Sequence, residues 1–139
     1  MNRRNFVLSA AATTAAAALL PSAVLAAKAY RPGLVKKELA AGKTVFLDFT
    51  ASWCGTCQSQ GRTIKALRAE NPAYDKAISF IDVDWDEYKR ADLTKALRIP
   101  RRSTLVVLKG DKELGRIVAG TARGQIKALM DTALAAATA

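Results

Sequence analysis

The chain has 139 residues, half of them hydrophobic, which predicts one domain of ordinary size. It carries 22 basic against 12 acidic residues, but the basic side chains are scattered, so the charge does not indicate nucleic-acid binding. Two Cys and no His exclude a complete structural zinc site, which normally takes four Cys or His ligands.

The first 26 residues have the pattern of an export signal. Arg3 and Arg4 precede a weakly apolar run rich in Ala, Thr and Leu, and small side chains follow near Ala26. The two adjacent arginines resemble those of a twin-arginine signal. We therefore expect an export signal peptide at 1–26 and a separate domain at 27–139.

The most favourable cleavage position is after Ala26, because Val24 and Ala26 occupy the small-residue positions, and cleavage after Ala29 is the second option. A retained membrane anchor is the alternative. It is less favoured because a run of about 14 apolar residues is shorter than the roughly 20 needed to span a bilayer.

After the signal, helix and strand patterns alternate. In chain order they predict a helix at 34–40, a strand at 44–50, a helix at 54–69, a strand at 77–84, a polar connection at 85–90, a helix at 91–97, a hairpin of strands at 104–109 and 113–118, a helix at 121–134 and a frayed tail at 135–139. Alternating strands and helices imply parallel pairing, and the hairpin adds antiparallel strands.

Both cysteines directly follow the most apolar strand. Cys54 and Cys57 form a Cys-x-x-Cys pair, and Gln58 stands where covalent haem attachment would need His. A redox-active dithiol is the favoured interpretation, because a structural disulfide closing so short a loop stabilises little. Asp48 interrupts the strand, and a buried carboxylate is costly unless it has a partner or a function. An Asp at the strand edge that faces solvent is the alternative.

The segment from Phe46 to Cys57, with Trp53 before the first cysteine, resembles the thioredoxin superfamily, and the resemblance extends over residues 43–134. It is most similar to exported thioredoxin-like proteins of the bacterial periplasm. The resemblance implies an α/β thioredoxin-like fold, with a central mixed sheet of about four strands flanked by helices.

The position of the cysteines suits disulfide exchange. Cys54 is expected at a helix N-terminus, whose partial positive charge favours the thiolate, so it should be the attacking thiol and Cys57 the resolving thiol. The resemblance implies that Asp48 is a buried acid that moves a proton to or from Cys57. It also places Phe80 where thioredoxin carries a lysine near that acid.

Six residues are expected to form the substrate groove beside the cysteines: Trp53, Gly55, Thr56, Arg102, Ser103 and Thr104. Trp53 could instead serve only in packing. The family normally has a cis-proline immediately before the strand that begins here at Thr104. Ser103 occupies that place in the favoured alignment, and Pro100 does so if the loop is longer.

These features predict an exported, periplasmic thiol–disulfide oxidoreductase that needs no cofactor or metal beyond its own disulfide. Its expected partners are protein thiols and disulfides, with a membrane electron donor as a further possibility, and it is expected to be a monomer that binds no nucleic acid. The alternative is a periplasmic protein that binds Cu(I) or handles metals through the two soft thiolates. A redox-inactive module that only binds a partner is a third option.

Overall fold

The computed structural model describes residues 25–139, so nearly all of the export signal expected at 1–26 lies outside the described residues. The elements, in chain order, are β1 (Lys28–Ala29), α1 (Leu34–Ala40), β2 (Thr44–Thr50), α2 (Gly55–Glu70), α3 (Ala73–Ala77), β3 (Ile78–Asp84), α4 (Trp85–Tyr88), α5 (Asp92–Ala96), β4 (Thr104–Lys109), β5 (Lys112–Val118) and α6 (Arg123–Ala137). None of the helices within this part of the chain is long and apolar enough to cross a membrane.

The strands form one mixed sheet in the order β1-β3-β2-β4-β5. β2 is parallel to β3 and antiparallel to β4, and β5 completes the expected hairpin with β4. The expectation of about four strands was therefore short by one. The additional strand, β1, has two residues and pairs parallel to β3. A strand this short contains no alternation of polar and apolar residues that sequence reasoning could detect.

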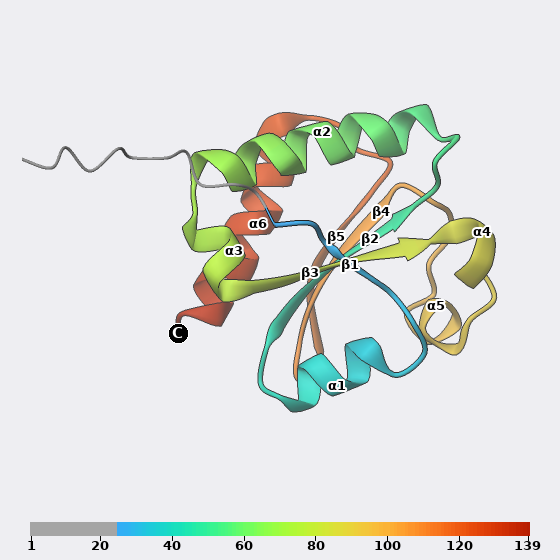
Figure 1. Ribbon diagram of the computed structural model, residues 1–139, viewed down its shortest axis with the longest axis horizontal. Coiled ribbons are helices and arrows are strands. Elements are labelled where there is room, and N and C mark those ends of the chain that lie inside the picture. Colours follow the sequence, from blue (N-terminus) through green and yellow to red (C-terminus); the bar gives the residue numbers. More distant parts are fainter. Residues whose placement is uncertain (1–24) are drawn as a thin grey trace, which may run out of the picture.

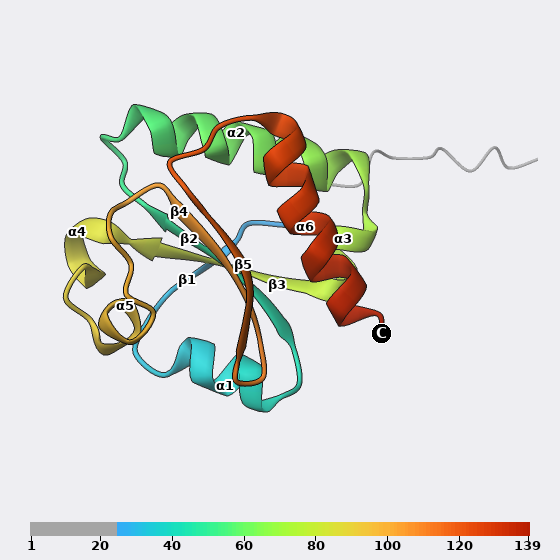
Figure 2. The ribbon, with the colours of Figure 1, turned by 180° about the vertical axis from the view of Figure 1, so that it is seen from behind.

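Helices cover both faces of the sheet (Figures 1 and 2), with α2, α3 and α6 on one face and α1, α4 and α5 on the other. Successive side chains of a strand point to opposite faces. Phe46 accordingly packs in the cluster under α2 and α6, whereas Val45 and Leu47 pack in the cluster on the α1 side. Every residue from Thr44 to Phe49 is buried, as expected for a central strand covered on both faces.

Pairing of β2 with β4 brings two distant segments of the chain together. The register pairs Phe49, near the end of β2, with Thr104, the first residue of β4. The segment that leads from β2 into α2 therefore lies beside the segment that enters β4. Cys54 belongs to the first segment and Ser103 to the second, although 49 positions separate them along the chain.

Two local predictions were wrong, and one helix was not predicted. Residues 73–77 form α3, for which no element was expected, and residues 85–88 form α4 where a polar connection was expected. α4 begins because the Asp84 carboxylate accepts a hydrogen bond from the Asp86 backbone N–H at 3.0 Å, which is a side-chain cap. The tail does not fray at Ala135, since α6 continues to Ala137 through alanines, the strongest helix formers.

Candidate active site

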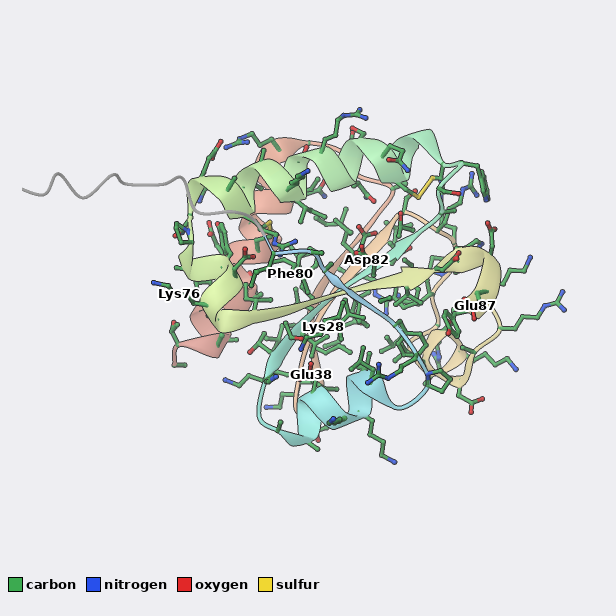
Figure 3. All side chains as sticks on the ribbon, viewed as in Figure 1. Lys28, Glu38, Lys76, Phe80, Asp82 and Glu87 are labelled. Carbon is green, nitrogen blue, oxygen red and sulfur yellow. A yellow bond between two sulfur atoms is a disulfide. The ribbon has the colours of Figure 1, made fainter. Side chains whose placement is uncertain are left out.

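Cys54 and Cys57 form a disulfide at the start of α2, with their Cα atoms 5.2 Å apart (Figure 3). Cys54 is the residue that caps the helix, and its sulfur accepts a hydrogen bond from the Cys57 backbone N–H at 3.2 Å. The free N–H groups and partial positive charge of a helix N-terminus favour an anionic sulfur. Both cysteines are almost fully buried, with 3% of Cys54 and 2% of Cys57 exposed.

The Ser103 hydroxyl contacts both sulfurs. Its oxygen lies 3.2 Å from the sulfur of Cys54 and 3.0 Å from that of Cys57, and Ser103 is completely buried. The structure thus brings the predicted groove residue Ser103 directly against the cysteine pair.

Ser103 has a left-handed backbone conformation, with φ of 62°. Its N–H donates to the Phe49 carbonyl at 2.7 Å, and its carbonyl accepts from the Ala119 N–H at 2.9 Å. The Gln60 side-chain amide donates to the same carbonyl at 3.0 Å. These three hydrogen bonds hold a conformation that a residue other than glycine rarely adopts.

Ser103, not Pro100, lies against the disulfide. No peptide bond between residues 25 and 139 is cis, so the bond before Ser103 is trans. Pro100 is exposed and precedes Arg101 and Arg102 in the loop that leads to β4. The loop therefore brings a hydroxyl to the sulfurs where the family pattern has a proline ring.

Asp48 is buried in β2 on the face that α2 covers, with 7% of its surface exposed, so it does not face solvent from a strand edge. One of its carboxylate oxygens has no hydrogen-bond partner among the described residues. Burial, and to a smaller extent the neighbouring Asp82 carboxylate, raises the pKa of Asp48 to about 8. Asp48 and Cys57 line the same cavity of about 440 Å³, so the acid lies on the side of the resolving cysteine.

A second carboxylate, missed by sequence reasoning, stands next to Asp48. The parallel register of β2 and β3 pairs Asp48 with Asp82, and both line a further cavity of about 430 Å³. Asp82 is more exposed than Asp48, but partial desolvation raises its pKa, and the positive charge of Arg68 opposes part of that rise. The pair depends on the observed register, in which Thr44 pairs with Ile78; a strand starting at residue 77, as expected from the sequence, would have paired Asp48 with Ile81.

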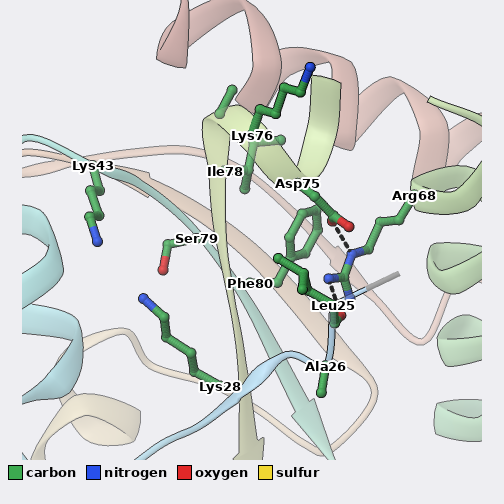
Figure 4. Close-up of a pocket in the computed structure, with 11 residues that line it drawn as sticks. Leu25, Ala26, Lys28, Lys43, Arg68, Asp75, Lys76, Ile78, Ser79 and Phe80 are labelled. Atoms are coloured by element: carbon green, nitrogen blue, oxygen red, sulfur yellow. Dashed lines mark hydrogen bonds and ion pairs between the residues drawn. The ribbon is translucent and has the colours of Figure 1, made fainter. Parts of the chain in front are cut away.

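Arg68 stacks on Phe80, and its positive charge acts on Asp82 but is not among the causes that set the pKa of Asp48. Its guanidinium lies 4.4 Å from the centre of the Phe80 ring, a favourable cation–π distance. The close-up in Figure 4 shows Arg68 reaching from α2 between Asp75 and Leu25. Arg68 also forms an ion pair with Asp75 at 2.6 Å, so its charge is shared with a third carboxylate.

The exposed Trp53 forms the outer rim of the site. More than half of its surface, 58%, is open to solvent, so it is not a core residue. The Arg102 guanidinium lies 4.5 Å from its ring centre, and its indole N–H donates to both Asp86 carboxylate oxygens at 2.9 and 3.1 Å. Trp53 is thus fixed from two sides beside the cysteines, by β4's entry loop and by α4.

The remaining predicted groove residues have different surroundings. Gly55 is exposed and Thr56 half-buried in the first turn of α2, whereas Thr104 is fully buried and donates to the Arg101 carbonyl at 2.7 Å. Thr104 therefore shapes the loop instead of facing a substrate. Sequence reasoning also missed Trp85, which packs against the cysteine cluster, and Gln60, which is fully buried and joins the Ser103 and Gly120 carbonyls.

A mixed sheet between helical layers, with a Cys-x-x-Cys disulfide at a helix N-terminus and a buried acid behind it, defines a thioredoxin-like redox protein. The thioredoxin family model matches residues 23–132. The chain belongs to the thioredoxin family, whose chemistry is thiol–disulfide exchange. The superfamily resemblance and the thioredoxin-like α/β fold are thereby confirmed.

Individual relatives agree with this assignment. The chain is 31% identical over 90 residues to thioredoxin H2-1 of Oryza sativa, covering 65% of this chain and 60% of the relative. It is 32% identical over 82 residues to a thioredoxin of Echinococcus granulosus, covering 59% and 71% of the two chains. Among solved structures, Malassezia sympodialis thioredoxin superposes with a TM-score of 0.68 at 25% identity, covering 84% of this chain and 96% of the other.

The residues from 25 to 139 contain no cluster of three or more His, Cys, Asp or Glu side chains that could hold a metal ion. The two sulfurs are bonded to each other, and the oxygen nearest to both belongs to Ser103. The arrangement of the two sulfurs suits the making and breaking of a disulfide bond.

Proposed function

We propose that this protein is a thiol–disulfide oxidoreductase that acts outside the cytoplasm on protein substrates. One observation carries the proposal: the Cys54–Cys57 disulfide lies at the N-terminus of α2, and Cys57 shares a cavity with the buried Asp48. Membership of the thioredoxin family supports the same chemistry.

The proposed reduction of a substrate proceeds in two exchanges. The Cys54 thiolate attacks one sulfur of the substrate disulfide, and the other substrate sulfur leaves with the electron pair and takes up a proton. Cys57 then loses its proton and attacks Cys54 in the mixed disulfide. The second substrate sulfur leaves and takes up a proton, so the substrate gains two electrons from the dithiol and two protons, one released by Cys57 and one from water. The reverse sequence oxidises a substrate dithiol, and the relative reduction potentials decide the direction.

The surroundings give each residue a role. The N-terminus of α2 and the Cys57 N–H stabilise the Cys54 thiolate, which is the attacking species. Asp48 takes the proton from Cys57 and returns it in the reverse reaction. A carboxyl with a pKa of about 8 both gains and loses a proton near neutral pH, as a general acid–base group requires.

The proposed periplasmic location rests on the sequence of residues 1–26, with its paired arginines and small residues before Ala26. β1 begins at Lys28, so cleavage after Ala26 would leave every strand of the sheet intact. Disulfides persist in that compartment. We propose a monomer whose electrons come from a membrane donor if it acts as a reductase.

Insulin reduction tests the chemistry. The reduced protein should reduce insulin disulfides catalytically, and Cys54→Ser should abolish turnover. Cys57→Ser should instead accumulate a mixed disulfide with the substrate, visible as added mass, because the resolving thiol is missing. Turnover by Cys54→Ser equal to that of the unmodified protein would contradict the proposal.

Two further measurements address location and the metal alternative. In bacterial cells, the exported protein should begin at Ala27, and replacing Arg3 and Arg4 by Lys should keep it in the cytoplasm. Mass spectrometry of the reduced protein titrated with Cu(I) separates the alternatives. A stable 1:1 complex in a protein that leaves insulin oxidised would favour metal handling.

A further inference from the structure

The Ser103 hydroxyl has one proton to donate and two sulfurs within reach. Its oxygen lies 3.2 Å from the Cys54 sulfur and 3.0 Å from the Cys57 sulfur, and no part of Ser103 is exposed to solvent. A disulfide sulfur is a weak hydrogen-bond acceptor, whereas a thiolate is a strong one because hydrogen bonds to ionised groups are about twice as strong. The contact therefore gains strength when the disulfide is reduced.

The fold holds this hydroxyl at a conformational cost. Ser103 has a φ of 62°, and such left-handed residues cost on the order of 1–3 kcal/mol and gather at functional sites. The Phe49 carbonyl, the Ala119 N–H and the Gln60 amide together fix its backbone. Gln60 also donates to the Gly120 carbonyl, at 2.9 Å, so one buried side chain joins both loops beside the hydroxyl.

We propose that the Ser103 hydroxyl is a catalytic hydrogen-bond donor that stabilises whichever of the two cysteine sulfurs carries the negative charge. This inference rests on the proposed thiol–disulfide chemistry and adds a residue to it. The hydroxyl donates to the Cys54 thiolate in the resting reduced protein. It turns toward Cys57 when that thiol loses its proton to Asp48 and attacks the mixed disulfide. The hydroxyl keeps its own proton throughout, so it changes no electron or proton count.

Stabilising a thiolate stabilises the reduced protein relative to the disulfide. The Ser103 hydroxyl should therefore make the couple a stronger oxidant, and removing it should make the couple more reducing. The Cys57 N–H also donates to the Cys54 sulfur, so Cys54 keeps one donor when Ser103 is changed. We accordingly expect the pKa of Cys54 to rise in a Ser103 variant, while the thiolate still forms.

Other charged groups face the site from the elements around it. Arg102 approaches from the loop before β4, and Asp86 approaches from α4 through the Trp53 indole. Asp48 of β2 lines the same cavity as Cys57, together with Asp82 and Asp84 of β3. A change at Ser103 leaves all of these groups in place. A difference between variant and unmodified protein then measures the hydroxyl and not the surrounding charge.

The experiment compares Ser103→Ala and Ser103→Gly with Ser59→Ala as the matched control. Ser59 carries a hydroxyl on α2 outside the Cys-x-x-Cys segment, and among the described residues it makes no hydrogen bond to either sulfur. The Ala variant keeps the backbone restriction, and the Gly variant tolerates positive φ, so together they separate loss of the hydroxyl from strain. Circular dichroism and thermal melting establish that each variant is folded.

Two readouts are measured: the pKa of Cys54, from thiolate absorbance, and the equilibrium with glutathione. Both Ser103 variants should raise that pKa by about one to two units, the range expected for a hydrogen bond to a charged group. At a pH where Cys54 is ionised in both the variant and the unmodified protein, a rise of one pKa unit moves the glutathione equilibrium about tenfold toward the protein disulfide. This corresponds to a reduction potential about 30 mV more negative. Ser59→Ala should change neither value.

Unchanged values in both Ser103 variants would overturn the proposal, and so would an equal shift in Ser59→Ala. Failure of the proposed function is a separate result, because neither readout uses a protein substrate. If the unmodified protein does not reduce insulin but Ser103→Ala shifts the equilibrium with glutathione, the proposed function fails and the role of Ser103 stands. If insulin is reduced and the couple does not shift, the role of Ser103 alone fails.

Discussion

Replacing Asp48 by Asn should stabilise the protein and impair its activity. Asp48 is buried, has a pKa of about 8, and leaves one carboxylate oxygen without a partner. An unfolded chain ionises the same carboxyl near its ordinary value of 3.8. Between these two values the folded protein binds a proton that the unfolded chain has released. The free energy of unfolding therefore falls as pH rises from about 4 to about 8.

The size of this effect follows from the difference in pKa. Each pKa unit corresponds to about 1.36 kcal/mol, so Asp48 lowers the stability by about 4 kcal/mol at pH 7 and by less than about 1 kcal/mol at pH 4. Asn has nearly the same shape and does not ionise. Its unpaired amide keeps a cost of about 1–3 kcal/mol at every pH, so the gain of Asp48→Asn over the unmodified protein should grow with pH.

The assay is urea unfolding of the oxidised protein at pH 4, 6 and 8, since an intact disulfide does not titrate. Asp111→Asn is the matched control, because Asp111 is exposed in the turn between β4 and β5. The free energy of unfolding of the control should match that of the unmodified protein at each pH. A stability difference for Asp48→Asn that is equal at pH 4 and pH 8 would refute the assignment of a raised pKa. Insulin reduction by Asp48→Asn should also slow, because Cys57 loses its proton acceptor.

Two further changes have defined outcomes. Gln60→Ala should lower the free energy of unfolding by about 1–3 kcal/mol, because it leaves the buried Ser103 and Gly120 carbonyls with one donor fewer, and urea unfolding measures this. Lys28 and Lys43 hydrogen-bond to Glu38 and lower its pKa to about 2 from 4.5. Its contribution is present above about pH 4.5 and is lost as pH falls toward 2, so Glu38→Gln should destabilise at pH 6 and have little effect at pH 2. A loss of stability that is equal at both pH values would contradict this reasoning.

The parts of the site that sequence reasoning predicted are those that one continuous segment encodes. The apolar run of β2, the interrupting Asp48 and the Cys-x-x-Cys pair lie within 14 consecutive positions, and the strand-to-helix setting follows from their order. Burial of Asp48 follows as well, because a nearly continuous apolar run indicates a strand covered on both faces.

The parts that sequence reasoning missed depend on contacts between distant segments. Asp82 faces Asp48 only because β3 pairs with β2 in one register, and a shift by one residue would turn it to the other face. Gln60 resembles any polar residue on a helix until tertiary packing buries it against two loops. The two-residue β1 forms only because β3 has a free edge with which to pair.

The position of Ser103 before β4 was predicted from the sequence, whereas its contacts with the sulfurs depend on the fold. Its surroundings explain how the site tolerates a residue other than proline. Both of its backbone polar groups are bonded inside the fold, to Phe49 and to Ala119 with Gln60. A strand of another protein therefore finds no free backbone partner at Ser103 itself, and the neighbouring exposed surface consists of Trp53 with Arg102 stacked on it. The proposed role of the hydroxyl is thus separable from backbone pairing, since the hydroxyl faces the sulfurs inside while Arg102, Trp53 and Asp86 form the rim outside.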